Sequence, residues 1–277
     1  MKVPPMISVL QLGTLDYATA ELLQKKLVAL RKENQIGDVL LLLEHPPVIT
    51  LGRNAKSANI LASPELLAQR GVEVVECDRG GDVTFHGPGQ LVGYPIFDLR
   101  AFTTPDGDRK TLGVIEFVRK MEEALIRTCA DFRISTERVP KLTGVWTRPN
   151  TVSKDAGRKD SLERDAAKIA AIGIHVSRAV TSHGFALNVN VDLSYFNLII
   201  PCGITTRPVT SMLQELGTPQ SLDRVAESIT RNFGHVFHRQ ILWLESLDAL
   251  LPNSIGVPVK PPAELRRLRK EDETFFA

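Results

Sequence analysis

The sequence is poor in cysteine, and this shortage excludes several classes of protein. Only Cys77, Cys129 and Cys202 occur in 277 residues. An odd and sparse set of this kind is not a disulfide framework. None belongs to a Cys-x-x-Cys pair, so we expect no structural zinc site and no other metal site. A protein of the reducing cytoplasm fits this cysteine usage best.

The sequence also lacks long apolar runs and a strong net charge. Its longest apolar stretch, residues 39–43, is far too short to cross a bilayer, and the first 15 residues do not have the pattern of a signal peptide. A net charge of +2 argues against a dedicated nucleic-acid binder. We therefore expect no membrane and no nucleic acid among the partners. Basic groups near residues 158–159 and 266–270 are explained either as solvated surface charge or as a landing site for an acidic protein.

The pattern of apolar residues predicts an α+β fold. Leucines at 23, 27 and 30 among charges predict a long helix over residues 16–35, and further helices are predicted over residues 111–130 and, starting from Ser221, over 221–237. Ser63-Pro64 predicts the start of a short helix. Apolar runs predict strands over residues 7–12, 39–43, 72–76, 168–176 and 184–191. Because these elements do not follow a strict βαβ rhythm, we predict a mixed β-sheet flanked by helices rather than a Rossmann fold.

Two regions have no core pattern and define the predicted domain boundaries. Residues 148–165 are polar and charged, which is typical of an exposed loop. The stretch after His238 contains four prolines and then a basic end. We therefore predict a catalytic domain over residues 1–238, with the loop inserted in it, and a C-terminal extension over residues 239–277.

The densest polar segment is rich in glycine and runs over residues 79–90. Four glycines in twelve residues are costly in a regular element, but they let backbone N–H groups approach a ligand closely. The segment is neither a Walker loop nor a GxGxxG turn that opens a helix. A glycine-rich hairpin turn would explain the glycines but not Arg79, Thr84 and His86 beside them. We interpret the segment as part of a ligand site.

Cys202 is the strongest candidate for a nucleophile. Proline and glycine flank it, which predicts a sharp turn from which the thiol can reach a cleft. An unperturbed thiol is only slightly ionised at neutral pH, so catalysis needs a cation or a base beside it. Lys168, His86 and His183 are candidates for that role, and the residues alone leave the choice open. Cys77 and Cys129 are weaker candidates because they lie at a strand end and within a helix.

In their order along the chain, these segments resemble the lipoate–protein ligase B family, the octanoyl-[acyl-carrier-protein]:protein N-octanoyltransferases, also called lipoyl(octanoyl) transferases. The matching stretches are residues 44–47, 50–53, 79–90, 94–95, 144–146, 168–173, 183–188, 201–203 and 209–212. Any one of them is a weak signal, whereas their order is specific. The resemblance implies the mixed sheet flanked by helices that is found in the catalytic domain of biotin and lipoate protein ligases.

The resemblance also implies roles for particular residues. Cys202 corresponds to the acyl-thioester nucleophile, and Lys168 to the lysine that lowers the pKa of this thiol and acts as a general acid and base. The substrate-binding positions correspond to Arg79, Gly80, Gly81, Asp82, Val83, Thr84, Phe85, His86, Ala171, Ile172, Gly173, Gly184, Phe185 and Ala186. His183 and Asn188 are possible supporting residues. We expect N–H groups of the glycine-rich segment to face the oxyanion, and the small residues to leave a slot for the alkyl chain.

The implied reaction is a pair of acyl transfers without ATP or another cofactor. Cys202 takes the octanoyl group from octanoyl-acyl carrier protein, and a lysine of a lipoyl domain then takes it from the enzyme. The implied acceptors are the lipoyl domains of 2-oxoacid dehydrogenase complexes and the glycine cleavage H protein. The alternatives are an ATP-dependent lipoate–protein ligase of the same fold, a cysteine thioesterase or hydrolase, and a non-catalytic acyl-binding module. A monomer is the default expectation.

The sequence departs from the family pattern in three places. The polar loop before Lys168 is longer than usual, the chain continues past the usual end, and His175 stands where the family more often has Arg or Lys. None of these touches the implied chemistry, so they bear on partner docking and local charge.

Overall fold

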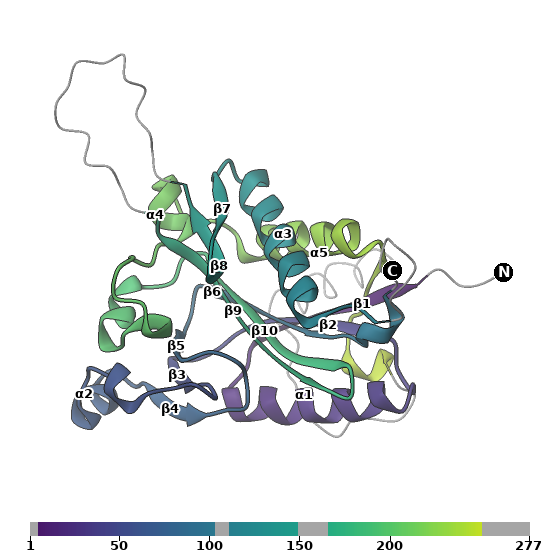
Figure 1. The fold of residues 1–277 in the computed structure, drawn as a ribbon, viewed down its shortest axis with the longest axis horizontal. Coiled ribbons are helices and arrows are strands. Elements are labelled where there is room, and N and C mark those ends of the chain that lie inside the picture. The colour runs from purple at the N-terminus through teal and green to yellow at the C-terminus, as the bar shows by residue number, and fades with distance from the viewer. Residues whose placement is uncertain (1–4, 103–110, 149–165, 251–277) are drawn as a thin grey trace, which may run out of the picture.

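The computed structural model describes residues 5–102, 111–148 and 166–250, and in them a mixed sheet lies between two layers of helices (Figure 1). The sheet has eight strands in the order β11-β1-β2-β6-β10-β9-β8-β7. Their bounds are β1 Met6–Thr14, β2 Asp38–Glu44, β6 Gln90–Ile96, β7 Thr136–Val139, β8 Leu142–Thr147, β9 Lys168–Ser177, β10 Val180–Asn188 and β11 Gln240–Trp243. β1 pairs in parallel with both β2 and β11, and the other neighbours are antiparallel. The α+β prediction is therefore confirmed.

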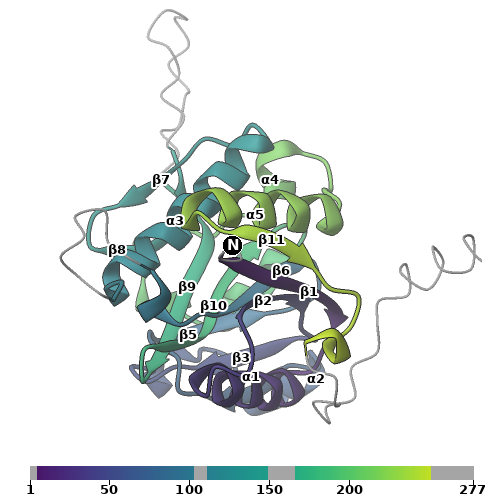
Figure 2. The same ribbon diagram turned by 90° about the vertical axis from the view of Figure 1, so that its right-hand side faces the viewer.

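One helix covers one face of this sheet, and two helices cover the other (Figure 2). α1 spans Tyr17–Lys32, α3 spans Val114–Asp131 and α5 spans Leu222–Phe237. The Asp16 carboxylate caps α1 by accepting the Thr19 N–H at 2.8 Å, and Ser221 caps α5. Leu23 and Leu27, one turn apart on α1, are fully buried in the cluster between α1 and the sheet, where α1 packs on β6 and β10. The three predicted long helices are thus present, with ends that differ by a few residues.

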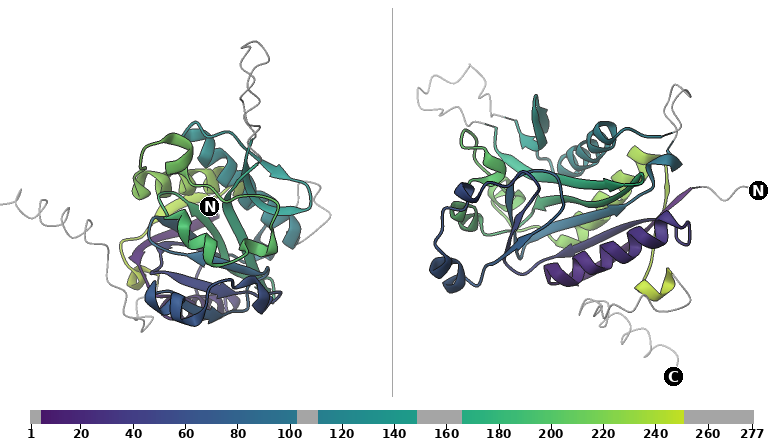
Figure 3. Two further views of the ribbon diagram at one scale, coloured as in Figure 1. Left: turned by 90° about the vertical axis from the view of Figure 1, so that its left-hand side faces the viewer. Right: turned by 60° about the horizontal axis from the view of Figure 1, so that its bottom comes forward.

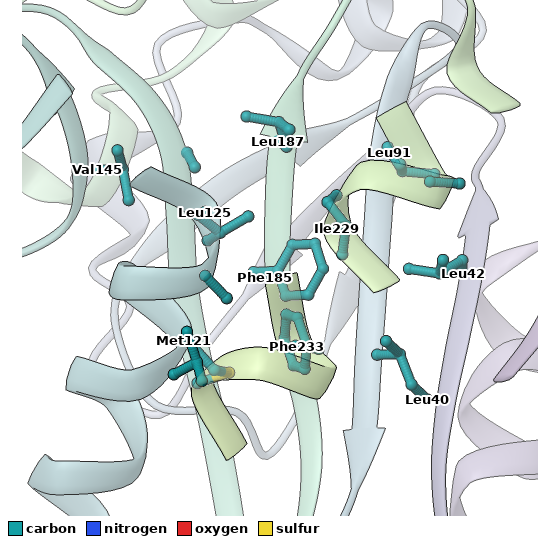
Figure 4. Close-up of a cluster of buried hydrophobic side chains, with 14 of the residues drawn as sticks. Leu40, Leu42, Leu91, Met121, Leu125, Val145, Phe185, Leu187, Ile229 and Phe233 are labelled. Carbon is teal, nitrogen blue, oxygen red and sulfur yellow. The ribbon is translucent and has the colours of Figure 1, made fainter. Parts of the chain in front are cut away.

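The larger core fills the space between α3, α5 and the sheet. Met121 and Leu125 of α3 and Ile229 and Phe233 of α5 point toward Phe185 on β10 (Figure 4). The ring centroids of Phe185 and Phe233 are 5.6 Å apart. Full burial of side chains of this size contributes about 1.5–3 kcal/mol each, which fixes the helices on the sheet behind the candidate site.

A second, smaller sheet packs against one end of the large one. It has the order β4-β3-β5, with bounds β3 Val48–Leu51, β4 Glu73–Glu76 and β5 Val83–His86, and the short helix α2, Pro64–Gln69, lies beside it. Two further short helices follow β10, η3 over Leu193–Leu198 and η4 over Pro201–Gly203, and then α4 over Met212–Leu216. Figures 1 and 3 show the small sheet beside the segment between β10 and α4.

The large sheet continues past the predicted domain boundary at residue 238, because its edge strand β11 follows that residue. Ile241 of β11 is the register partner of Ile7 on β1, and Leu247 is buried in the cluster that contains α1. β11 has only four residues, too few for a two-residue alternation of apolar and polar side chains to identify it as a strand. The predicted loop beyond Arg148 and the extension beyond residue 250 lie outside the described residues. Among the helices that the structure describes, none is long and apolar enough to cross a membrane.

Candidate active site

A cavity of about 250 Å³ lies between the two sheets, near the lower end of the range for small-molecule sites. β9 and β10 form one wall, the segment that leads into β5 forms another, and η4 adds Cys202. Most of the predicted site residues line it, including Cys202, Lys168 and His183. The predicted substrate-binding residues that line it are Arg79, Gly80, Gly81, Asp82, Thr84, His86, Ala171, Ile172, Gly173, Gly184, Phe185 and Ala186.

Two predicted binding residues point away from this cavity. Residues 83–86 form a strand, in which successive side chains alternate between the two faces. Thr84 and His86 face the cavity, whereas Val83 and Phe85 enter a separate apolar cluster behind the small sheet. The Phe85 ring stacks on Tyr195 with centroids 4.8 Å apart. The side chains of Val83 and Phe85 therefore do not line the cavity, and their contact with substrate stays a prediction.

Cys202 lies on a strained turn. Its φ of 57° and ψ of 19° are in the left-handed region, which non-glycine residues rarely adopt. A side chain at the following residue, Gly203, would place its Cβ 2.8 Å from Asp82 Oδ2, so only glycine fits there. Asp82 also accepts hydrogen bonds from Asn59 Nδ2 at 2.6 Å and from Lys56 N at 3.2 Å. Asn59 O in turn accepts the Ile200 N–H at 2.8 Å, so Asn59 links the Asp82 carboxylate to the residue before the turn that holds the nucleophile.

Backbone bonds tie the start of β9 to the segment after the turn. The Lys168 N–H donates to Pro208 O at 2.8 Å, and the Thr210 N–H donates to Lys168 O at 2.9 Å. Lys168 and Cys202 therefore reach the same cavity from two segments that are bonded to each other. Both also line an adjoining niche of about 10 Å³.

The Lys168 side chain is buried and has no anionic partner. The residue is 6% exposed, and its Nζ lies 4.7 Å from the centroid of the Trp146 ring. A desolvated cation over an indole face is stabilised by about 2 kcal/mol. Among the described residues the ammonium makes no ion pair and no hydrogen bond, including none to Cys202 Sγ. The structure therefore presents a buried positive charge at the cavity without a compensating carboxylate.

Arg79 adds a second buried cation to the same wall. Its guanidinium donates to Thr50 O at 2.7 Å, to Thr50 Oγ1, to Asp82 O at 2.7 Å and to Gly80 O at 3.1 Å. All these acceptors are neutral, and within the described part of the chain Arg79 forms no ion pair. Because neither Lys168 nor Arg79 is ion-paired within the described residues, both charges are available to a group that develops negative charge in the cavity, which the Asp82 carboxylate also lines.

The histidines beside the cavity are poor candidates for the base. Burial, with the nearby His45 and Arg79, lowers the pKa of His86 to about 3, and its Nδ1–H donates to Gln90 Oε1 at 2.7 Å. An imidazole with that pKa is too weak a base to take a proton from a thiol. Burial also lowers the pKa of His183, whose Nε2–H donates to Asp78 Oδ1 at 2.6 Å. Lys168 is the candidate that the geometry leaves.

The other two cysteines are outside the cavity. Cys129 is fully buried on α3, and burial raises the pKa of its thiol to about 12. Cys77 Sγ donates to Leu51 O at 3.4 Å and does not line the cavity. Of the three cysteines, Cys202 alone reaches it.

Several cavity residues were not predicted. Tyr17 of α1 and Tyr94 of β6 line the wall, and burial raises the pKa of both hydroxyls. The Tyr94 O–H donates to Nε2 of the neutral His45 at 2.7 Å, and the His45 Nδ1–H donates to Leu15 O at 2.6 Å. Tyr94 lies in a segment that carries the family resemblance, so the resemblance could have identified it as a site residue. Nothing in the sequence near Tyr17 distinguishes it from a core residue.

Supporting contacts and close packing complete the site. The predicted supporting residue Asn188 lines the niche rather than the main cavity, and its amide bonds Gln90 and Thr210. A Cβ at Gly173 would lie 2.6 Å from Gly80 O, so this glycine permits a close backbone approach as well as lining the cavity. In the described part of the chain, no three His, Cys, Asp or Glu side chains are grouped so that they could hold a metal ion.

Comparison with known proteins agrees with this geometry. Residues 16–234 match the model of the lipoyl protein ligase A/B catalytic domain. An octanoyltransferase of Koribacter versatilis is 60% identical over 96% of this chain and 98% of its own length. An octanoyltransferase of Acidobacterium capsulatum is 55% identical over 89% of this chain and 96% of its own.

Solved structures share the fold at low sequence identity. A bipartite lipoate protein ligase from Thermoplasma acidophilum superposes with a TM-score of 0.62 at 16% identity, over 87% of each chain. A lipoate-protein ligase A bound with ATP gives a TM-score of 0.58 at 15% identity, over 88% of this chain and 89% of its own. The family match, the highly identical relatives and the shared architecture together establish that this chain belongs to the lipoyl protein ligase A/B family, among its octanoyltransferases, as the lipoate–protein ligase B motifs predicted.

Proposed function

We propose that this enzyme moves an octanoyl group from octanoyl-acyl carrier protein, through a thioester on Cys202, to a lysine of a lipoyl domain. The observation that carries the proposal is one cavity that holds the thiol on a strained turn and the uncompensated ammonium of Lys168. The high identity to octanoyltransferases supports the acyl group and the class of acceptor. This reaction is the first step of protein lipoylation from endogenous octanoate.

The first transfer forms the acyl-enzyme. The Cys202 thiolate, stabilised by the Lys168 charge, attacks the carbonyl carbon of the octanoyl thioester. A sulfur–carbon bond forms, and negative charge moves to the carbonyl oxygen. When the intermediate collapses, the bond to the carrier's sulfur breaks, and the carrier leaves as a thiolate that takes a proton from Lys168. One thioester replaces another, so the step is nearly balanced in energy and needs no ATP.

The second transfer gives the amide. The ε-amine of the acceptor lysine attacks the Cys202 thioester, and a carbon–nitrogen bond forms. The amine loses a proton to the neutral Lys168, and the Cys202 thiolate leaves. The products are an octanoyl-lysine and the starting enzyme with a charged Lys168. Conversion of a thioester into an amide is downhill, which drives the pair of steps. The acceptors would be lipoyl domains of 2-oxoacid dehydrogenase complexes and the glycine cleavage H protein, in the cytoplasm.

Mass spectrometry of the enzyme after incubation with octanoyl-acyl carrier protein tests the proposal. We expect one octanoyl group on the peptide that contains Cys202, and its loss when an apo lipoyl domain is added. Cys202→Ser should form no such adduct by this route, and Cys129→Ala, outside the cavity, should behave as the unmodified enzyme. An adduct on Cys77 or Cys129, or none, would overturn the mechanism.

The alternatives give different outcomes in the same assay. Transfer that requires ATP and free octanoate would indicate a ligase of the same fold. Release of octanoate from Cys202 at the same rate with and without the acceptor would indicate a thioesterase. Tight binding of the acyl chain without an adduct would indicate an acyl-binding module.

A further inference from the structure

Thr84 has a hydroxyl at the cavity that the fold leaves unused. It lies on β5, and the residue is 7% exposed. Strand alternation turns its side chain to the cavity, away from the apolar cluster that takes Val83 and Phe85. Among the described residues its hydroxyl makes no hydrogen bond. Its Oγ1 is not among the buried atoms that lack a partner, so the hydroxyl opens onto the cavity and is free to pair with a bound ligand.

Most of the neighbouring donors are already engaged within the protein. The Gly80 N–H donates to Ile174 O at 2.9 Å, and the Val83 N–H donates to Asp82 Oδ1 at 2.7 Å. These two N–H groups of the glycine-rich segment are therefore unavailable to an oxyanion, contrary to our expectation from the sequence. Both N–H bonds of the Gln90 amide are also used, by Phe85 O at 3.2 Å and by Asn188 Oδ1 at 2.9 Å.

The position of Thr84 relates it directly to the nucleophile. β5 packs against η4, which carries Cys202. Thr84, Lys168 and Cys202 all line both the cavity and the adjoining niche of about 10 Å³. A space of about 10–15 Å³ accommodates one water-sized atom. The niche is therefore large enough for a single oxygen atom, and Cys202, Lys168 and Thr84 are among the residues that line it.

We propose that this niche receives the carbonyl oxygen of the acyl thioester and that Thr84 is a catalytic hydrogen-bond donor to it. This inference rests on the proposed acyl transfer. As Cys202 sulfur bonds to the carbonyl carbon, charge accumulates on the oxygen, and the Thr84 O–H bond to it strengthens. When the leaving sulfur–carbon bond breaks, the charge returns to the carbonyl. Thr84 keeps its proton throughout, so it needs no base.

Replacement of the hydroxyl tests the role with little change in shape. Thr84→Val keeps the volume and the preference for a strand, and it removes the donor. Loss of one such donor lowers the rate of a step of this kind by on the order of 10²-fold. We expect single-turnover octanoylation of Cys202 to slow to that extent, with the KM for octanoyl-acyl carrier protein changed less than about threefold. Thr84→Ser, which retains the hydroxyl, should restore most of the rate.

A matched control comes from another strand. Thr136 of β7 is 5% exposed, and its Oγ1 has no hydrogen-bond partner, but it does not line the cavity. Thr136→Val therefore makes the same chemical change on a strand outside the site. We expect it to acylate Cys202 at the unmodified rate.

Octanal provides a second readout, which measures binding rather than turnover. Its carbonyl carbon adds the Cys202 thiol reversibly, and the former carbonyl oxygen becomes the hydroxyl of a hemithioacetal. We expect Thr84→Val to weaken inhibition by octanal at least about tenfold and to leave binding of 1-octanol, which has no carbonyl group, unchanged. Circular dichroism reports whether the variants fold, and Thr84→Ala replaces the valine variant if that one does not.

The outcomes separate this inference from the function on which it depends. If the unmodified enzyme forms the Cys202 adduct and Thr84→Val forms it equally fast, the donor role is wrong and the transferase proposal stands. If the serine variant is as slow as the valine variant, the hydroxyl is not the cause, and the inference is also wrong. If the unmodified enzyme forms no adduct on Cys202, both proposals fail.

Discussion

His45 and His86 are buried next to the cavity, and they should make the stability of this enzyme depend strongly on pH. The dependence should extend above the pH range in which most carboxylates titrate. Burial lowers the pKa of His45 to about 4 and that of His86 to about 3. In the unfolded chain both have a pKa of about 6.5. Between these limits the unfolded state binds more protons than the folded state, so stability is lost as the pH falls from about 6.5 toward 4.

The expected loss follows from these values. Between pH 7.5 and 5.5, each histidine takes up its proton only on unfolding, which lowers the free energy of unfolding by about 1.4 kcal/mol. The pair therefore accounts for about 3 kcal/mol, a large part of the 5–15 kcal/mol that stabilises a typical domain. His183, whose pKa is also lowered by burial, acts in the same direction. Asp38, whose pKa burial raises, acts in the opposite direction, so the comparison needs variants.

Urea unfolding at pH 7.5, 6.5 and 5.5 measures the effect. His45→Gln can keep the bonds to Leu15 and Tyr94 but cannot titrate, so its stability should fall by about 1.4 kcal/mol less than that of the unmodified protein over this range. His235→Gln, at an exposed position of α5, should keep the full dependence. An unchanged dependence in His45→Gln would refute the conclusion that His45 is neutral in the folded protein.

Further predictions concern the site itself. Lys168→Met removes the buried positive charge at the cavity that stabilises the Cys202 thiolate, so Cys202 octanoylation, followed by quenched-flow mass spectrometry, should slow by at least about 10²-fold; a rate within about twofold would contradict the role. Trp146→Leu removes the face on which Lys168 lies and should slow the same step about tenfold, whereas Trp146→Phe, with a weaker cation–π interaction, should slow it less. Gly173→Ala places a Cβ 2.6 Å from Gly80 O and should destabilise the fold by about 1–3 kcal/mol in thermal unfolding, and an unchanged Tm would show that the glycine-rich segment moves freely.

Local chemistry made the helices predictable from the sequence. Asp16, Ser63 and Ser221 each accept a backbone N–H at the start of a helix, and the apolar spacing of 3.6 residues marks the buried face. Most of the elements that were not predicted are strands without a clear two-residue alternation of apolar and polar side chains. β6 is buried along its whole length, so it shows no alternation, and it contains Gly93 and Pro95. β5 has only four residues and lies between two pairs of glycines, so its alternation is too short to identify it as a strand.

The candidate site was predictable as a set of residues but not as an arrangement. The motifs identified Cys202 and Lys168, and both reach one cavity. No local pattern indicates that the Lys168 ammonium lies on Trp146, because that contact joins β9 to β8. Tyr17 reaches the cavity from the start of α1, which is far along the chain from β9 and η4. Only the tertiary fold brings these segments together. If β5 had been recognised as a strand, the alternation of its side chains would have predicted that Thr84 and Phe85 face opposite sides of the small sheet.

The reacting groups come from three separate parts of the fold, so their arrangement depends on the contacts between those parts. β9 of the large sheet carries Lys168, β5 of the small sheet carries Thr84, and η4 carries Cys202. β5 packs against η4, and Asn59 connects the two by its bonds to the Asp82 carboxylate and to the Ile200 N–H. The backbone bonds between Lys168 and the segment 208–210 connect the first to the third. Because the strained φ of Cys202 persists only while these contacts hold it, loosening them should reduce the reactivity of the thiol before it unfolds either sheet.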